Sequence, residues 1–285
     1  MTTASVGNGA RFAARPVSGG GTPTPLWTGW AHPFPRLDLT GCPGLVVVAP
    51  HPDDETLGLG GTIAALTVAG VPVEVVSVSD GGAAYAGLSA VGRNRLESVR
   101  RFELRRAAGI LGVSEMTCLG LPDGELSDHE AWLANALTAI LRRRRAGVWC
   151  AATWRGDGHP DHEAVGRAAV FAARRASAVL LEYPIWMWHW ARPGDTAVPW
   201  ERAHAAPLTR SDIDRKRRAA QSFRSQFEAS DRRGAPVLPP CVLRRLLSVG
   251  EVVFADTAAA RRVLRHHARR VIGPLVAGHP LVRAA

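Results

Sequence analysis

The sequence has no long apolar run, no paired cysteines and almost no lysine, and each of these absences excludes a class of protein. No apolar stretch among the 285 residues approaches the roughly 20 residues that a membrane-spanning helix needs. The four cysteines lack paired spacing, which argues against a disulfide framework and against a cysteine-based zinc site. The first residues lack the basic region and apolar stretch of a secretory signal. We therefore expect a cytoplasmic protein with no membrane span.

The positive charge is carried almost entirely by arginine. Lys216 is the only lysine among 35 basic residues, which face 25 acidic ones and leave a formal charge of +10. Clustered cations bind nucleic acid by releasing counterions from phosphate, but these arginines are spread over short clusters in helix-like segments. Solvated helix faces and codon bias explain such a distribution. We expect no nucleic-acid partner, and a basic nucleic-acid-binding protein stays open as the non-enzymatic alternative.

Composition divides the chain into a short arm and one large domain. Residues 1–25 are rich in glycine, threonine, serine and proline, which predicts a flexible N-terminal arm. Residues 26–285, in a chain with 46% hydrophobic residues, are enough to bury a sizeable core. We expect them to form a single domain that becomes less regular from about residue 185.

From Leu45 onward, short β-branched runs alternate with longer amphipathic stretches. The predicted strands are Leu45–Ala49, Val73–Val78, Met116–Leu119, Val148–Thr153 and Val179–Tyr183. The predicted helices between them are Thr56–Ala69, Arg93–Leu111, Glu130–Arg144 and His162–Ala176. The second half predicts a Trp-rich strand over residues 182–190, a helix over Asp212–Phe227, a strand over Glu251–Phe254 and a helix from about Thr257. This alternation predicts an α/β fold with a doubly wound, mostly parallel, Rossmann-like sheet that binds ligands at the carboxyl ends of its strands.

A histidine and three acidic residues follow the first predicted strand. Residues 50–55 read Pro-His-Pro-Asp-Asp-Glu and open the first predicted helix. His51 and Asp54 are three residues apart, so both can reach one ion from a tight turn, and imidazole and carboxylate are suitable zinc ligands. Asp53 lies between them and is free to accept a proton from water. A helix cap explains one or two acids near a helix start, but not three after a histidine.

A second cluster follows the fourth predicted strand. Residues 156–162 read Gly-Asp-Gly-His-Pro-Asp-His and open another predicted helix. Carboxyl ends of parallel strands share one sheet edge, so the two clusters can meet there. Together they offer His, Asp and His as ligands and leave one position for water, which is the pattern of a catalytic zinc site. A carboxylate base and a second histidine beside such a site are suited to hydrolysis.

At these two segments the sequence resembles the PIG-L/LmbE-like family of zinc-dependent N-acetylglucosaminyl deacetylases. The motifs His-Pro-Asp-Asp-Glu and His-Pro-Asp-His, about a hundred residues apart, are highly specific in combination, and weaker matches extend to Phe227. The resemblance implies one catalytic metal ion, zinc or another divalent metal. Its implied ligands are His51, Asp54 and His162.

The resemblance also implies catalytic roles for the other motif residues. Asp53 becomes the general base, and His159 stabilises the oxyanion or serves as the acid. Asp161 becomes the partner that orients His159. Some members carry a tyrosine two residues before this histidine, where the present chain has Asp157, and that difference moves acid assistance to His159.

Two further residues are implied as substrate contacts. Arg100 opens the run Arg-Arg-Phe-Glu-Leu, in which the family's first arginine contacts the sugar, and Asp123 lies in a matching loop, Leu-Gly-Leu-Pro-Asp-Gly. The alternatives are a helix-face ion pair between Arg100 and Glu103, and an ordinary turn aspartate.

The resulting hypothesis is a zinc-dependent amidohydrolase that removes an acyl group, in the first place acetyl, from the amino group of an N-acylated aminosugar or its conjugate. A metal-dependent hydrolase of another bond, such as a phosphoester, stays open as a rival. Trp186, Trp188 and Trp190 alternate and would share one face of a strand. They would form either a platform for a sugar or aromatic acyl group, or a packing surface for outer helices.

Overall fold

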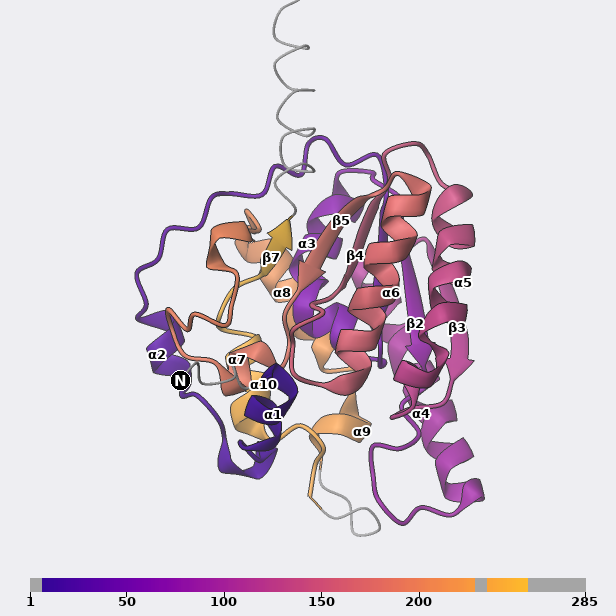
Figure 1. Cartoon of the computed structure of the whole chain (residues 1–285), viewed down its shortest axis with the longest axis vertical. Helices are drawn as coiled ribbons and strands as arrows, with labels where there is room; N and C mark the ends of the chain where they lie inside the picture. The colour runs from indigo at the N-terminus through magenta and orange to yellow at the C-terminus, as the bar shows by residue number, and fades with distance from the viewer. Residues whose placement is uncertain (1–6, 229–234, 256–285) are drawn as a thin grey trace, which may run out of the picture.

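A seven-stranded sheet forms the centre of the molecule (Figure 1). The computed structural model describes residues 7–228 and 235–255. The strand order is β3-β2-β1-β4-β5-β7-β6. The strands are β1 (Leu45–Ala49), β2 (Val73–Ser79), β3 (Glu115–Leu121), β4 (Trp149–Thr153), β5 (Val179–Tyr183), β6 (Ala203–Ala205) and β7 (Val252–Ala255). Strands β1 to β5 pair in parallel, whereas β7 runs antiparallel between β5 and β6. The predicted α/β fold with a mostly parallel sheet is confirmed.

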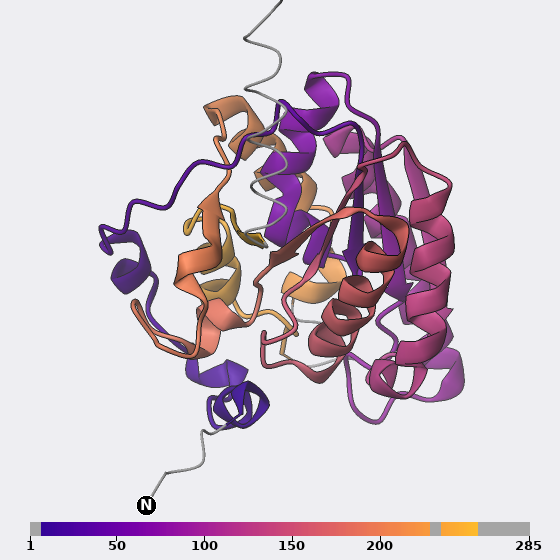
Figure 2. The ribbon, with the colours of Figure 1, turned by 45° about the horizontal axis from the view of Figure 1, so that its top comes forward.

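Helices cover both faces of this sheet, as Figures 1 and 2 show. One apolar cluster joins it to α3 (Asp54–Val68), α4 (Ala90–Leu111) and α8 (Arg210–Ala220), and a second joins it to α5 (Glu130–Arg142) and α6 (Pro160–Ala176). Strand β1 belongs to both, because Leu45 and Val47 point into the first cluster and Val46 and Val48 into the second. A strand buried on both faces must be apolar throughout, and each such side chain stabilises the fold by roughly 1.5–3 kcal/mol.

The strand order reverses between β1 and β4, which are parallel neighbours. From β1 the sheet extends through β2 and β3 to one side, and through β4 and β5 to the other. Adjacent strands at such a switch point diverge into loops that leave a crevice beyond their carboxyl ends. The loops after β1 and β4 carry the two motif clusters, so the fold itself brings them together.

The second half of the chain is more finely divided than the sequence predicts. The basic helix expected over 212–227 is two helices, α8 and α9 (Arg224–Phe227). The strand expected over 251–254 is confirmed as β7, whereas α10 (Pro240–Leu246) and β6 were not predicted. The helix expected from Thr257 lies outside the described residues. Among the described helices, none has the length and apolar content needed to cross a membrane.

The N-terminal segment packs on the domain, where a flexible arm was predicted. Its described part contains α1 (Asn8–Ala13), a short 3₁₀ turn and α2 (Thr24–Thr28), and α1 lies beside α7 (Met187–Trp190), as Figure 2 shows. The Asn8 side-chain amide donates to the Gly156 carbonyl at 2.8 Å, and the Trp27 indole N–H donates to the Trp188 carbonyl at 3.0 Å. The segment has few apolar residues, but its side chains form hydrogen bonds with residues that are far away in the chain.

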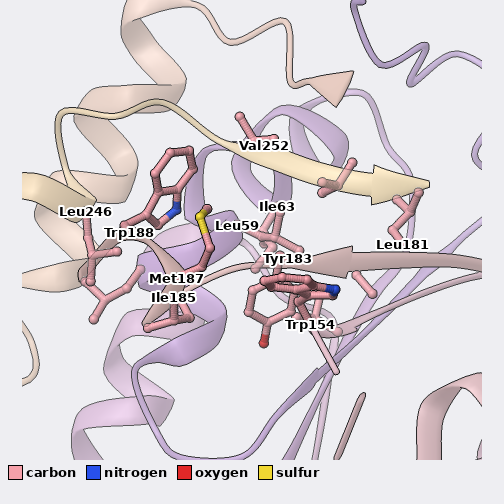
Figure 3. Packing of buried hydrophobic residues seen from close by; sticks show 14 of the residues in the cluster. Leu59, Ile63, Trp154, Leu181, Tyr183, Ile185, Met187, Trp188, Leu246 and Val252 are labelled. Carbon is pink, nitrogen blue, oxygen red and sulfur yellow. The ribbon is translucent and has the colours of Figure 1, made fainter. Parts of the chain in front are cut away.

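The Trp-rich segment is not a strand. Strand β5 ends at Tyr183 before Pro184, which has no N–H for the ladder, and the chain then turns into the short helix α7. The three tryptophans therefore have different surroundings. Trp186 lines a cavity, Trp188 packs edge-on against Trp27 at 4.9 Å between ring centroids, and the Trp190 indole N–H donates to the Asp157 carbonyl at 2.7 Å. Figure 3 shows Trp188 within the main apolar cluster.

Candidate metal centre and pocket

The turn between β1 and α3 holds Asp53 in a strained backbone conformation. Asp53 has a φ of 134°, which a residue with a side chain rarely adopts and which costs of the order of 1–3 kcal/mol. Two hydrogen bonds stabilise the turn: the Asp53 N–H donates to Glu55 Oε2 at 3.1 Å, and the His51 N–H donates to Asp54 Oδ2 at 3.1 Å. Strain of this kind is typical of functional sites, and here it brings the side chains of the first motif to the mouth of the crevice.

Three potential ligand atoms converge above the carboxyl ends of β1 and β4. His51 Nδ1 and His162 Nε2 each lie 3.3 Å from Asp54 Oδ2, and all three atoms lie within 4.8 Å of one another. His162 is fully buried, and its Nε2 has no hydrogen-bond partner in the described part of the chain. A buried polar atom without a partner is costly, and a metal ion would satisfy it. The three atoms fit a metal ion by geometry and by donor chemistry.

Each candidate histidine ligand is also held through its other ring nitrogen. His162 Nδ1 lies 2.9 Å from Asp157 Oδ2, and His51 Nε2 lies 3.0 Å from Asp123 Oδ1 and 3.2 Å from Asp161 Oδ2. His51, Asp123 and Asp161 form a second group that could hold an ion, but it shares His51 with the first. Metal-binding histidines commonly donate their free N–H to a carboxylate, so these acids are suited to orient the rings.

The pKa values in this cluster are set by burial and by the close approach of its charged groups, which act in opposite directions. Burial alone would raise the pKa of Asp54, but His162 and His51 lower it to about 2. Burial likewise opposes ionisation of Asp123, yet its hydrogen bond to His51 lowers its pKa. Although burial lowers the pKa of His51, hydrogen bonds to Asp123, Asp161 and Asp54 raise it well above its ordinary value. The carboxylates around His51 favour a positive charge at this position, which a bound metal cation would also supply.

Asp53 faces Arg100 at the edge of this cluster. Burial raises the pKa of Asp53 well above its ordinary value, although Arg100, at 3.7 Å, opposes the shift. Arg100 is itself buried and donates to the carbonyls of Gly81 and Pro52, both at 3.0 Å. The alternative pairing of Arg100 with Glu103 is wrong, because the Glu103 carboxylate accepts the N–H and hydroxyl of Ser225 instead.

His159 lines the same cavity as Asp53 and is held in its neutral form. Burial lowers its pKa to about 3, with further contributions from His162 and His51. The Asp161 backbone N–H donates to His159 Nδ1 at 3.2 Å, which requires the lone pair on that atom and leaves the proton on Nε2. His159 can therefore donate one hydrogen bond into the cavity.

The resemblance implied that Asp161 orients His159. In the structure the Asp161 carboxylate does not contact His159. That carboxylate accepts the backbone N–H groups of Gly124 at 2.8 Å and Leu126 at 3.2 Å, and it contacts His51. Only the backbone amide of Asp161 meets His159. The physical reason is that Asp161 lies in the first turn of α6 with its side chain turned toward the loop after β3, where two amide donors compete for it.

Comparison with known proteins agrees with this geometry. The family model described as PIG-L, GlcNAc-PI de-N-acetylase, matches residues 46–173. The chain is 31% identical over 204 residues to the probable N-acetyl-alpha-D-glucosaminyl L-malate deacetylase 2 of Bacillus cereus, an alignment that covers 65% of this chain and 84% of that protein. The chain belongs to the PIG-L family.

A second relative and a solved structure are also similar to this PIG-L protein. It is 29% identical over 255 residues to the 1D-myo-inositol 2-acetamido-2-deoxy-alpha-D-glucopyranoside deacetylase of Nocardia farcinica, over 81% of this chain and 82% of that one. The fold resembles the N,N'-diacetylchitobiose deacetylase structure from Pyrococcus horikoshii, with a TM-score of 0.53 at 24% identity over 67% of this chain and 75% of that one.

A cavity of about 290 Å³ adjoins the candidate centre of this PIG-L chain. Seven of the eight residues predicted for the site line it, and the eighth, Asp161, lies behind His51. Apart from Gln226, the polar lining is formed by His51, Asp53, Asp54, Arg100, Asp123, His159 and His162. These seven residues fall within the segment that the family model matches, 46–173, whereas Gln226 lies outside it.

Two residues that the sequence analysis did not assign support the centre. Asp157 is fully buried, contacts His162, and accepts the N–H groups of Ile185, Trp186 and Met187, each at 2.9 Å. Its position five residues before His162, in a glycine-flanked acidic turn, was the available signal. Phe12 lies 6.0 Å from His159 between ring centroids, and no local pattern in the sequence connects it to a site 147 residues away.

Proposed function

We propose that this PIG-L family protein is a zinc-dependent hydrolase that removes an acyl group, in the first place acetyl, from the amino group of an aminosugar or aminosugar conjugate. The observation that carries the proposal is the buried Nε2 of His162, which makes no hydrogen bond in the described part of the chain and lies 3.3 Å from Asp54 Oδ2, beside His51. Two relatives are named as deacetylases of N-acetylglucosaminyl compounds, and these names support an N-acylated aminosugar as the substrate.

His51, Asp54 and His162 would hold the zinc ion. When bound, zinc supplies a Lewis acid that lowers the pKa of water and polarises the amide carbonyl. Asp157 and Asp161 keep the two imidazole rings oriented through the nitrogen atoms that do not face the ion.

Asp53 and His159 would move the protons. Burial makes the Asp53 carboxylate more basic than an exposed one, so it is suited to accept a proton from the attacking water. His159 presents Nε2–H to the cavity, where it stabilises the oxyanion or protonates the departing amine. The two groups lie on two turns, one after β1 and one after β4, that line the same cavity, so both would face a substrate amide bound there.

Arg100 and Asp123 are proposed as contacts to the sugar. Both line the cavity on the side of Asp53, and both are fixed there by hydrogen bonds to backbone groups. A guanidinium and a carboxylate held in this way recognise hydroxyl groups without having to be reordered on binding.

We further propose a cytoplasmic location and no nucleic-acid partner. Some of the arginines that would attract phosphate are already paired with acids: Arg144 with Glu74 and Glu115, and Arg202 with Glu182. Paired cations release few counterions, so these arginines contribute little to nucleic-acid binding.

The test is metal analysis of the purified protein followed by an amine-release assay on N-acylated aminosugars. We expect about one equivalent of zinc and release of free amine, together with acetate, from at least one N-acetyl compound. Less than one equivalent after zinc supplementation, with no amine released, would overturn the proposal. Two bound ions with phosphate release would favour the phosphoesterase rival, which the sharing of His51 between both ligand groups argues against.

A further inference from the structure

The cavity beside the candidate centre has a second half that the proposed chemistry does not use. This half, which we name the apolar wall, consists of Leu57, Ile185, Trp186, Val237, Leu238 and Leu246. Five of its six members lie beyond residue 173, outside the segment that the family model matches. Sugar hydroxyls placed against the five aliphatic members would lose hydrogen bonds to water and gain none, and only Trp186 offers a ring face on which a sugar can stack. The aliphatic part of the wall is therefore unsuited to the sugar itself.

The apolar wall is held rigidly by neighbouring structure. Ile185, Leu238 and Leu246 belong to the main apolar cluster, and Figure 3 shows Ile185 and Leu246 beside Met187 and Trp188. Helix α10, which carries Leu246, packs against α7, and the Leu238 N–H donates to the Gln226 carbonyl at 2.9 Å. A preformed apolar surface binds an apolar group without a further ordering cost.

The wall is also fixed relative to the candidate metal centre, by a single carboxylate. Asp157 Oδ2 lies 2.9 Å from His162 Nδ1 and accepts the Trp186 N–H, while Oδ1 accepts the Ile185 N–H. One side chain therefore sets the position of a proposed ligand and of two wall residues. An amide at the centre would place groups attached to its substrate within reach of the wall.

We infer that the substrate carries an apolar substituent, an alkyl or aryl group, that packs against the apolar wall while the polar half of the cavity holds the sugar and the amide. The inference rests on the proposed deacylase function. The substituent can be part of the acyl group or of the group attached at the anomeric carbon, and both sources share the same recognition chemistry.

The test compares two series of substrates in the zinc-loaded, full-length protein. One series varies the acyl chain of glucosamine from acetyl through butanoyl to hexanoyl; the other keeps acetyl and varies a methyl, butyl or hexyl β-glycoside. All are used below micelle-forming concentration. A fully buried methylene contributes about fourfold in binding. We expect kcat/KM to rise at least about tenfold from the shortest to the longest member of one series.

Two matched variants locate the effect. Val237 and Val249 are both half-buried valines at the edge of the main apolar cluster, but only Val237 lines the cavity. Val237→Ser is expected to reduce the preference for the long substituent at least about threefold, whereas Val249→Ser leaves it unchanged. Equal kcat/KM along both series, with acetyl compounds still hydrolysed, would overturn this inference and leave the proposed function standing. An equal effect of the two variants would also overturn it. If no compound in either series releases amine, the proposed function itself has failed.

Discussion

The two halves of the cavity are built in different ways. The predicted residues of the polar half come from the turns after β1 and β4, the loop after β3 and helix α4, and several of their side chains are held by hydrogen bonds. The apolar wall comes from one residue of α3, a loop, a segment before α10 and α10 itself, and is held by packing. Gln226 apart, the polar half lies within the segment matched by the family model; Leu57 apart, the wall lies outside it. In the proposed function, the sheet edge would supply the reaction, and the irregular second half of the chain would supply selectivity.

Removing the proposed base should have the largest effect on the polar half. Asp53→Asn is expected to lower kcat by about a thousandfold, because a positioned base contributes roughly 10²–10⁴ to the rate, while zinc content stays the same. Asp80→Asn is the matched control, since Asp80 follows the neighbouring strand β2 and pairs with Arg101. Steady-state kinetics with metal analysis of both variants measure this. If kcat falls less than tenfold in Asp53→Asn, Asp53 is not the general base.

The next prediction concerns the pH dependence of stability in the metal-free protein. Burial raises the pKa of Glu55 to about 7, against a hydrogen bond from Thr56 that lowers it. The folded state therefore binds a proton that the unfolded state releases, and stability is full below the unfolded pKa of about 4.5 and is lost as pH rises through 7. The loss amounts to about 3 kcal/mol, or roughly a hundredfold in the unfolding constant.

Denaturant unfolding of chelator-treated protein between pH 5 and pH 8 measures this effect. Glu55→Gln should reduce the fall in unfolding free energy over that range, since the amide does not ionise. If the variant and the parent protein show the same slope, the carboxyl of Glu55 is not the group responsible.

Asp157 tests the link between the two halves. Asp157→Asn should weaken zinc binding about thirtyfold, because loss of a carboxylate behind a metal-binding histidine typically costs 10–100-fold. Asp195→Asn serves as the control, since Asp195 also accepts a backbone N–H and pairs with Arg11 but lies outside the cavity lining. Competition with a chelator gives the affinities. If Asp157→Asn leaves the zinc affinity unchanged, His162 does not bind the ion through Nε2 with Asp157 holding its Nδ1.

Phe12 is expected to give the smallest effect. Its ring lies 5.0 Å from Trp186 and 6.0 Å from His159, so it contacts both halves from outside. Phe12→Ala should lower kcat about fivefold at constant zinc content, and Phe12→Leu should restore part of the loss by refilling the space. A change in KM alone would place Phe12 in substrate binding, contrary to a positioning role.

The sequence predicted those features that depend on hydrophobic periodicity and on the position of residues at strand ends. Strand β1 was predicted to the residue because a strand buried on both faces is apolar throughout, and the two motifs were placed together because both follow parallel strands. Helix α7 and the packing of α1 were not predicted, since both depend on partners distant in the chain. The contact of Asp161 with His51 was missed for the same reason: spacing brings residues to one edge, but competing amide donors decide where a carboxylate points.

The most direct test of the account compares the two histidines of the second motif. His162→Ala and His159→Ala change residues three apart in the same turn, one assigned to the metal and the other to the substrate. Zinc titration of both variants, with circular dichroism to show that each is folded, should give almost no bound zinc for His162→Ala. It should give about one equivalent for His159→Ala, which is nevertheless inactive. Retention of zinc by His162→Ala, with its loss from His159→Ala, would contradict the assignment.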